Sequence, residues 1–138
     1  MTLYVETSAA AKLLVAEPES HALSAHLDLL AAEDGAIVSS MLLETELRRL
    51  AVRIDLDQAR VSDVLDRIDL YEPDRASFIE AGVLPGRYLR SLDALHVAMA
   101  IRVAADEMAT YDDRHAEAAR SVGLAVVDRG RAGRGQRA

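Results

Sequence analysis

The 138-residue sequence contains no cysteine, no tryptophan, one phenylalanine and a single lysine. Without cysteine, the chain can form neither a disulfide nor a thiolate metal site, which fits a reducing compartment. Because aromatic residues make up only 4% of the chain, the core must be built from alanine, leucine, valine and isoleucine. No apolar run approaches the ~20 residues that span a bilayer, and the N-terminus lacks the basic segment and apolar stretch of a signal peptide. We therefore expect a cytoplasmic protein that is not associated with a membrane.

The net charge of −7 is unevenly distributed along the chain. Residues 129–138 contain four arginines and no acid, whereas residues 1–128 carry 12 basic and 23 acidic side chains, a balance of −11. A body with this charge does not attract nucleic acid through its overall field. If the protein acts on phosphates, bound cations or a local arginine patch must reverse the sign close to them.

Short apolar runs alternate with helix-forming segments along most of the chain. Strands are predicted at about residues 3–5, 36–39, 69–72, 107–110 and 124–127. Helices are predicted at about 8–16, 20–32, from the second strand through 50, and at about 55–68, 76–82, 92–103 and 113–122. This alternation without hairpins indicates an α/β fold in which helices cover both faces of a parallel sheet. We expect one domain at 1–128, and a basic Arg/Gly tail at 129–138 whose composition predicts disorder.

Four acids are predicted to lie where a buried element meets a turn. Glu6 follows the first strand, and Asp112 follows the fourth. Because the carboxyl ends of parallel strands meet at one edge of a sheet, both side chains should emerge there. Asp93 lies at the start of the most apolar helix, and Glu46 lies between residues that should face the core.

Each acid alone is more simply explained by an ordinary structural role. Asp93 and Asp113 can stabilise helix N-termini, and Asp112 can be a turn residue. Glu44 can pair with Arg48 one helical turn later. As a set, however, several carboxylates without matching basic side chains repel one another unless hard cations lie between them. Sites made only of oxygen ligands are what Mg²⁺ and Mn²⁺ prefer.

The hydroxyl and histidine residues near these acids have simpler expected roles. Thr7 or Ser8 is expected to cap the first helix. His96 lies three residues after Asp93 on a buried helix, so we expect it in the core or behind the acids rather than as a metal ligand. His115 is expected at the surface.

Four short motifs occur in a fixed order along the chain. They are Val-Glu-Thr-Ser-Ala at 5–9, Glu-Leu-Arg at 46–48, Ser-Leu-Asp-Ala-Leu-His at 91–96, and Thr-Tyr-Asp-Asp-Arg at 110–114. This ordered set resembles the PIN-domain ribonucleases of the VapC toxin type. The pattern of that family is a strand followed by Asp-Thr-Ser-Ala, a helix with Glu-Leu, then Leu-Asp-Ala-hydrophobic-His, and Thr-Tyr-Asp with an arginine shortly after. The resemblance covers about residues 2–127.

The resemblance implies a three-layer α/β/α PIN-like domain with a short central parallel sheet. The implied function is that of the toxin of a type II toxin–antitoxin system, an endoribonuclease that hydrolyses phosphodiester bonds of RNA. Mg²⁺ or Mn²⁺ is the implied cofactor, and it would activate a water and offset charge in the transition state. The implied partners are the RNA substrate, a cognate VapB-like antitoxin that covers the acidic site, and a second copy of the chain in a homodimer.

The resemblance also assigns roles to residues by their position. The implied catalytic acids are Glu6, Glu46, Asp93 and Asp112. The implied metal ligands are Glu6, Asp93, Asp112 and Asp113. The residues expected to orient these groups from behind are Thr7, Ser8 and His96. Apart from the resemblance, Arg87 and Arg90 in the loop before Asp93 are candidates for steering the substrate phosphate toward the site, and a solvated loop explains them equally well.

Glu6 departs from the family pattern, which usually has aspartate at this position. Glutamate keeps the charge but moves the oxygens by roughly 1 Å, whereas Mg²⁺ demands near-ideal geometry. Two other functions therefore stay open. A PIN module that has lost catalysis through Glu6 would bind RNA or a protein partner. A phosphorylated receiver domain would need a lysine at a late strand end, but Lys12 lies in the first predicted helix.

Overall fold

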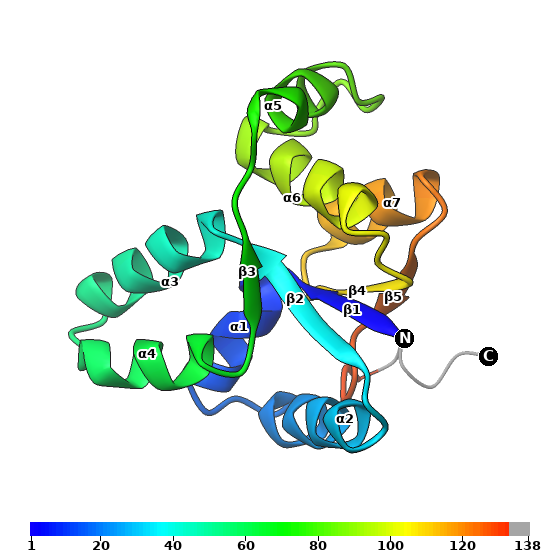
Figure 1. Ribbon diagram of the computed structural model, residues 1–138. Coiled ribbons are helices and arrows are strands. Elements are labelled where there is room, and N and C mark those ends of the chain that lie inside the picture. Colours follow the sequence, from blue (N-terminus) through cyan, green and yellow to red (C-terminus); the bar gives the residue numbers. More distant parts are fainter. Residues whose placement is uncertain (133–138) are drawn as a thin grey trace.

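The computed structural model describes residues 1–132, and the predicted alternation of strands and helices is confirmed within them (Figure 1). The strands are β1 (Thr2–Val5), β2 (Ala36–Ser40), β3 (Asp69–Tyr71), β4 (Glu107–Ala109) and β5 (Ala125–Val127). The helices are α1 (Thr7–Leu14), α2 (Ser20–Ala32), α3 (Leu42–Arg53), α4 (Gln58–Leu65), α5 (Arg75–Gly82), α6 (Ser91–Arg102) and α7 (Asp113–Ser121). Within residues 1–132, no helix is both long and apolar enough to cross a bilayer.

The strands form one parallel sheet in the order β3-β2-β1-β4-β5. The first strand in the sequence thus lies at the centre, where Leu3 is in register with both Ile37 of β2 and Glu107 of β4. The chain winds from β1 to β2 and β3 on one side, and β4 and β5 are added on the other. Because the direction of winding changes between β1 and β4, the crevice at the carboxyl ends of these two strands is where an open α/β sheet is expected to hold a site.

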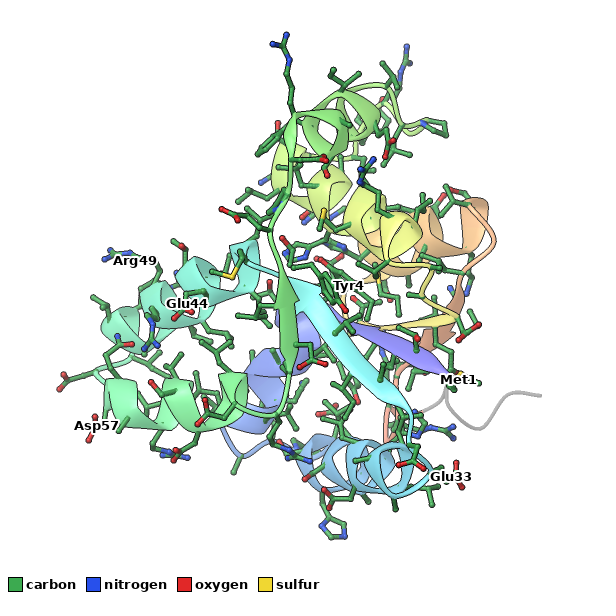
Figure 2. The ribbon with its side chains drawn as sticks, in the orientation of Figure 1. Met1, Tyr4, Glu33, Glu44, Arg49 and Asp57 are labelled. Carbon is green, nitrogen blue, oxygen red and sulfur yellow. The ribbon has the colours of Figure 1, made fainter. Side chains whose placement is uncertain are left out.

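Successive residues of β1 face opposite helical layers because side chains alternate along a strand. Leu3 and Val5 pack into a core with residues of α1, α2, α3 and α4, whereas Tyr4 packs into a second core with Val97 of α6 and Ala119 of α7. Figure 1 shows α1 to α4 on one side of the sheet and α6 and α7 on the other, with α5 beyond α6. Figure 2 labels Tyr4 near the centre of the molecule. The predicted three-layer α/β/α fold is confirmed.

The end of the described chain lies against the domain. The Tyr111 hydroxyl donates to the Arg129 carbonyl at 2.7 Å, and the Arg131 guanidinium pairs with the Asp113 carboxylate at 3.0 Å. Disorder was predicted from residue 129 onward, so these contacts hold the first residues of the predicted tail. The rest of that tail, residues 133–138, lies outside the described residues, and the boundary between domain and tail stays a prediction.

Candidate active site

The structure brings the four predicted acids to the carboxyl edge of the sheet. Glu6 directly follows the central strand β1, and Asp112 is the N-cap residue of α7 just after β4. Asp93 lies in the first turn of α6. Glu46 lies in α3, the helix that follows β2. The four carboxylates therefore come from elements on both faces of the sheet, next to the point where its winding reverses.

The Glu6 carboxylate is turned into the protein, and the residue is only 3% exposed. Its Oε2 atom accepts a hydrogen bond from the Ser8 backbone N–H at 2.7 Å. Its Oε1 atom accepts from the hydroxyls of Ser8 and Thr110, both at 2.6 Å. Glu6 is therefore the N-cap of α1, and the prediction that Thr7 or Ser8 caps this helix was wrong. The physical reason is that the Glu6 backbone is extended, whereas Thr7 is already helical.

Glu46 is held by a buried histidine. The His96 Nε2 and Glu46 Oε1 atoms are 2.6 Å apart, and the Tyr4 hydroxyl lies 2.7 Å from His96 Nδ1. Since an ionised carboxylate only accepts, these contacts place the imidazole proton on Nε2 and make Nδ1 the acceptor of the Tyr4 hydroxyl. Burial disfavours the charge on Glu46, but hydrogen bonds, chiefly the one from His96 with a further one from Thr7, outweigh burial and hold the pKa of Glu46 below its usual value. Burial raises the pKa of the Tyr4 hydroxyl well above its usual range, so it remains protonated.

Asp93 has a matching partner in His115. The His115 Nε2 atom lies 2.7 Å from Asp93 Oδ1, and the rings of His115 and His96 meet edge to face with centroids 6.1 Å apart. Among the described residues, His115 Nδ1 is buried without a hydrogen-bond partner. The expectation that His115 lies at the surface was wrong, because this residue is on the face of α7 that packs inward together with Ala119.

Asp112 is linked to Glu6 through Thr110. Its backbone N–H donates to the Thr110 hydroxyl at 3.2 Å, and that hydroxyl in turn donates to Glu6. Its Oδ1 atom accepts from the backbone N–H of Arg114 at 2.9 Å, so Asp112 is the cap of α7 and not only the turn residue that was expected. Asp113 points elsewhere, since it is paired with Arg131.

Three of the four acids are accessible to solvent and one is not. The exposed fraction of the side chain is 26% for Glu46, 21% for Asp93 and 33% for Asp112. Glu6 lies behind them with both oxygens occupied. A molecule that approaches this edge can therefore touch Glu46, Asp93 and Asp112 but not Glu6.

The acids supply oxygen ligands suited to a hard divalent cation, but their present arrangement does not form a site for one. Each carboxylate is directed at a protein donor rather than at a shared point. Within residues 1–132, no group of three His, Asp or Glu side chains is arranged to hold a metal ion. In this geometry the network is a set of carboxylate–imidazole and carboxylate–hydroxyl pairs, which can share protons and accept a proton from water.

The two arginines predicted to bind phosphate lie in the loop between α5 and α6, and both are exposed. Arg87 and its neighbour Tyr88 line a pocket of about 250 Å³ between this loop and α7. We call it the Tyr88 pocket. Arg90 is the N-cap residue of α6 and lies three residues before Asp93. Both arginines are therefore close in sequence to Asp93, and Arg87 lines the Tyr88 pocket.

The single lysine lies away from the acids. Lys12 bonds to Glu17 and Glu19 at the end of α1, and its ammonium lies 5.2 Å from the centre of the Tyr111 ring. The interpretation as a receiver domain requires a lysine at a late strand end, so the placement of Lys12 argues against it.

Sequence reasoning missed three members of the network, namely Tyr4, Thr110 and His115. Tyr4 carried a usable signal, because a tyrosine in a strand that is otherwise apolar needs a partner for its hydroxyl when it is buried. Thr110 opens the motif at 110–114, but nothing in the sequence indicates that its hydroxyl bonds to Glu6, and His115 carried no signal. Their partners, Glu6 and Asp93, are 104 and 22 residues away in the sequence, so the contacts depend on how the elements pack.

The chain was compared with protein families and with proteins of known sequence, and it matches members of both. The model of the PIN domain family matches residues 3–121. The chain is 39% identical to Ribonuclease VapC35 of Mycobacterium tuberculosis over 136 residues, which cover 94% of this chain and 98% of the relative. It is 38% identical to Ribonuclease VapC46 of the same organism, with coverage of 91% and 95%.

Solved structures share the fold at much lower identity. VapBC2 from Rickettsia felis, bound to a DNA fragment from its promoter, matches with a TM-score of 0.70 and 17% identity, and covers 92% of this chain and 98% of its own. VapC20 of Mycobacterium tuberculosis, a toxin that cleaves the sarcin–ricin loop, matches with a TM-score of 0.66 and 16% identity, and covers 88% and 95%. At these identities the likeness speaks for the fold alone.

Proposed function

The chain belongs to the PIN-domain family and to its VapC branch, and from this premise we propose that it is the toxin ribonuclease of a toxin–antitoxin pair. Its reaction is the hydrolysis of phosphodiester bonds within RNA. The observation that carries the proposal is the gathering of Glu46, Asp93 and Asp112 at the solvent-facing carboxyl edge of β1 and β4. The proposal is also supported by the names of the relatives, Ribonuclease VapC35 and Ribonuclease VapC46, which this chain matches over nearly their whole length.

The chemistry of the proposal follows from the exposed acids. Hydrolysis forms a bond from water oxygen to phosphorus and breaks the bond from phosphorus to a sugar oxygen. A carboxylate near the water accepts its proton, and the departing sugar oxygen takes a proton from solvent. We assign the proton-accepting role to Glu46, Asp93 or Asp112, because only these acids of the set reach solvent. His96 and His115 hold two of them in fixed orientations.

Glu6 has a different role in this proposal. Its carboxylate ties the end of β1 to Ser8 at the start of α1 and to Thr110 at the end of β4. It therefore fixes the distance between the strands from whose ends the site is built, and it positions the acids rather than contacting RNA.

The resemblance implies a divalent cation, Mg²⁺ or Mn²⁺. The described carboxylates do not fit such an ion as they stand, because no three of the candidate ligands converge. We therefore assign no step of the hydrolysis to a metal, and dependence on Mg²⁺ or Mn²⁺ stays a prediction.

The proposed partners follow from charge and from exposed apolar side chains. An antitoxin of the VapB type that presents an arginine would find complementary charge at the acidic edge. We also propose a homodimer through α5, because Phe78 and Ile79 are 52% and 58% exposed and Val83, just after the helix, is 78% exposed. A cytoplasmic location, where RNA is available, completes the proposal.

One observation favours a second candidate, a PIN module that binds RNA or protein without cutting. Glu6 stands where the family usually has aspartate, and both of its oxygens are occupied by protein donors. If the chemistry needs a free carboxylate at this position, the protein is inactive.

The test measures cleavage of purified RNA in the presence of Mn²⁺ by wild type, Asp93→Asn and Glu6→Gln, with the ends of the products mapped. We expect Asp93→Asn to lose activity. Equal cleavage by all three preparations would show that a contaminant cuts the RNA, and the site assignment would fail. If Glu6→Asp cuts and wild type does not, the non-catalytic module is the correct reading.

A further inference from the structure

The Tyr88 pocket lies outside the acid network but adjoins it. Its lining includes Pro85, Arg87, Tyr88 and Leu89 of the loop between α5 and α6, together with Arg114 and Glu117 of α7. Figure 1 shows this loop and α7 on the same side of the sheet. The volume of about 250 Å³ lies below the ~300–1,000 Å³ of sites for drug-sized ligands. It therefore suits one planar group better than a helix or a peptide loop.

The aromatic side chain of the pocket is unusually exposed. Tyr88 is 81% exposed, and the Arg87 guanidinium lies 5.9 Å from the centre of its ring. Among the ion pairs of the described residues, none involves Arg87. An exposed ring beside a cation that has no acidic partner is an arrangement on which the bases of single-stranded nucleic acids stack, with the phosphate close to the cation.

The lining of the pocket is more basic than the chain as a whole. Arg87 and Arg114 contribute two positive charges against the one carboxylate of Glu117, with Asp112 beside Arg114, whereas the chain as a whole carries −7. This local excess of arginine favours a phosphate-bearing ligand more than the overall field does.

The pocket also adjoins one of the acids, because Arg114 of its lining contacts Asp112. The backbone N–H of Arg114 donates to Asp112 Oδ1 at 2.9 Å, and the Arg114 guanidinium Nε lies 3.8 Å from the same oxygen. A ligand that fills the pocket thus lies beside Asp112, one of the three acids that reach solvent.

We propose that the Tyr88 pocket binds one base of single-stranded RNA next to the phosphate that is cleaved. The base stacks on the Tyr88 ring, and Arg87 and Arg114 contact the flanking phosphates. This inference rests on the proposed ribonuclease function and assigns part of its substrate recognition to a residue outside the family motifs. It also predicts a preference for unpaired RNA, since a base inside a duplex cannot reach the ring.

The lack of tryptophan makes a direct test possible. In Tyr88→Trp the only indole of the protein lies in the pocket, so its fluorescence reports on that place alone. The probe is a ten-nucleotide single-stranded RNA of mixed sequence, added to Tyr88→Trp in an Asp93→Asn background to prevent cleavage. We expect saturable quenching by this RNA, and binding at least ~10-fold weaker for the same backbone with abasic riboses, because stacking accounts for the difference.

A second set of variants separates stacking from folding. Tyr88→Ala should weaken binding of the same RNA by about 10-fold, whereas Tyr88→Phe, which keeps the ring, should bind within about twofold of the parent. Tyr71→Ala is the control, because the Tyr71 ring is also exposed, at 46%, but lies on β3 and does not line the Tyr88 pocket. Circular dichroism shows whether each variant is folded.

Two results would overturn the inference. One is equal binding of intact and abasic RNA, which would mean that only phosphates are recognised. The other is an unchanged RNA affinity of Tyr88→Ala together with a changed oligomeric mass or loss of binding to the antitoxin, which would make the pocket a protein contact. The proposed function and the pocket can fail separately. If RNA quenches the fluorescence of Tyr88→Trp but wild type does not cleave RNA, the nuclease function is refuted and the binding pocket stands. If wild type cleaves RNA but binding does not depend on the base, the nuclease function stands and the pocket is refuted.

Discussion

The sharpest prediction concerns Glu6, whose carboxylate the structure uses for folding. In Glu6→Gln the side chain keeps its size but offers one acceptor oxygen in place of two. The Ser8 N–H, the Ser8 hydroxyl and the Thr110 hydroxyl all donate to the carboxylate, so at least one of these donors will face an amide N–H₂ group. Hydrogen bonds to a charged group are worth about 1.5–3 kcal/mol each, and a buried donor left unpaired costs about 1–3 kcal/mol.

We therefore expect the free energy of unfolding to fall by about 2–4 kcal/mol in Glu6→Gln. With a urea m-value of about 2 kcal/mol/M for a domain of this size, the midpoint should move down by about 1–2 M. The measurement is equilibrium unfolding in urea at neutral pH with EDTA present, so that no bound cation contributes. Glu33→Gln is the control, because it removes the same charge from an exposed residue that Figure 2 labels at the C-terminal end of α2.

The control should stay within about 0.5 kcal/mol of wild type, as most surface substitutions do. If Glu6→Gln unfolds at the same urea concentration as the control, the reasoning is refuted. The Glu6 carboxylate would then be free to turn toward the other acids, as the family resemblance implies.

Three further outcomes are expected. Hydrogen bonds from Ser77 and the nearby Arg102 hold the pKa of Asp74 below its usual value. The Asp74 carboxylate therefore stabilises the fold above its unfolded pKa, and this stabilisation is lost as the pH falls through its folded pKa. In thermal melts between about pH 5 and 2, the melting temperature of Asp74→Asn should fall less steeply than that of wild type. If the acids take up a cation, Mn²⁺ should raise the melting temperature of wild type and not that of Asp93→Asn, and EDTA should reverse the rise. Light scattering should show a dimer that Ile79→Glu converts to a monomer, whereas the equally exposed control Leu29→Glu leaves the dimer intact.

Most of the fold was predictable because it is encoded locally. β1 and β2 are short apolar runs bounded by polar residues, and α6 is apolar on nearly every side, so their type follows from pattern and composition. The parallel arrangement followed from the alternation of strands and helices. Helix starts were less predictable, because two hydroxyl residues next to Glu6 were better cap candidates by residue type, and only the backbone conformation at Glu6 decides between them.

Part of the candidate site was likewise predictable from the sequence, and part was not. The elements that carry Glu6, Asp93 and Asp112 were identified from sequence, since each acid stands at the end of a recognisable segment. Which atom each carboxylate contacts was not, because His115 reaches Asp93 only through the packing of α7 against α6. A pattern read along one segment carries no information on the rotation of one helix against another, and that rotation decides whether acids meet one another or a histidine.

The central place of β1 has a consequence for synthesis of the protein in the cell. This strand is made before the other four of the sheet, yet one of its two neighbours, β4, begins at Glu107. The Thr110 hydroxyl that holds Glu6 is made later still. Because domains made on the ribosome gain contacts in the order of translation, a nascent chain cannot assemble the acidic edge until translation has passed Thr110 and α7. The architecture thus separates the synthesis of Glu6 from the completion of its site by more than 100 residues of translation.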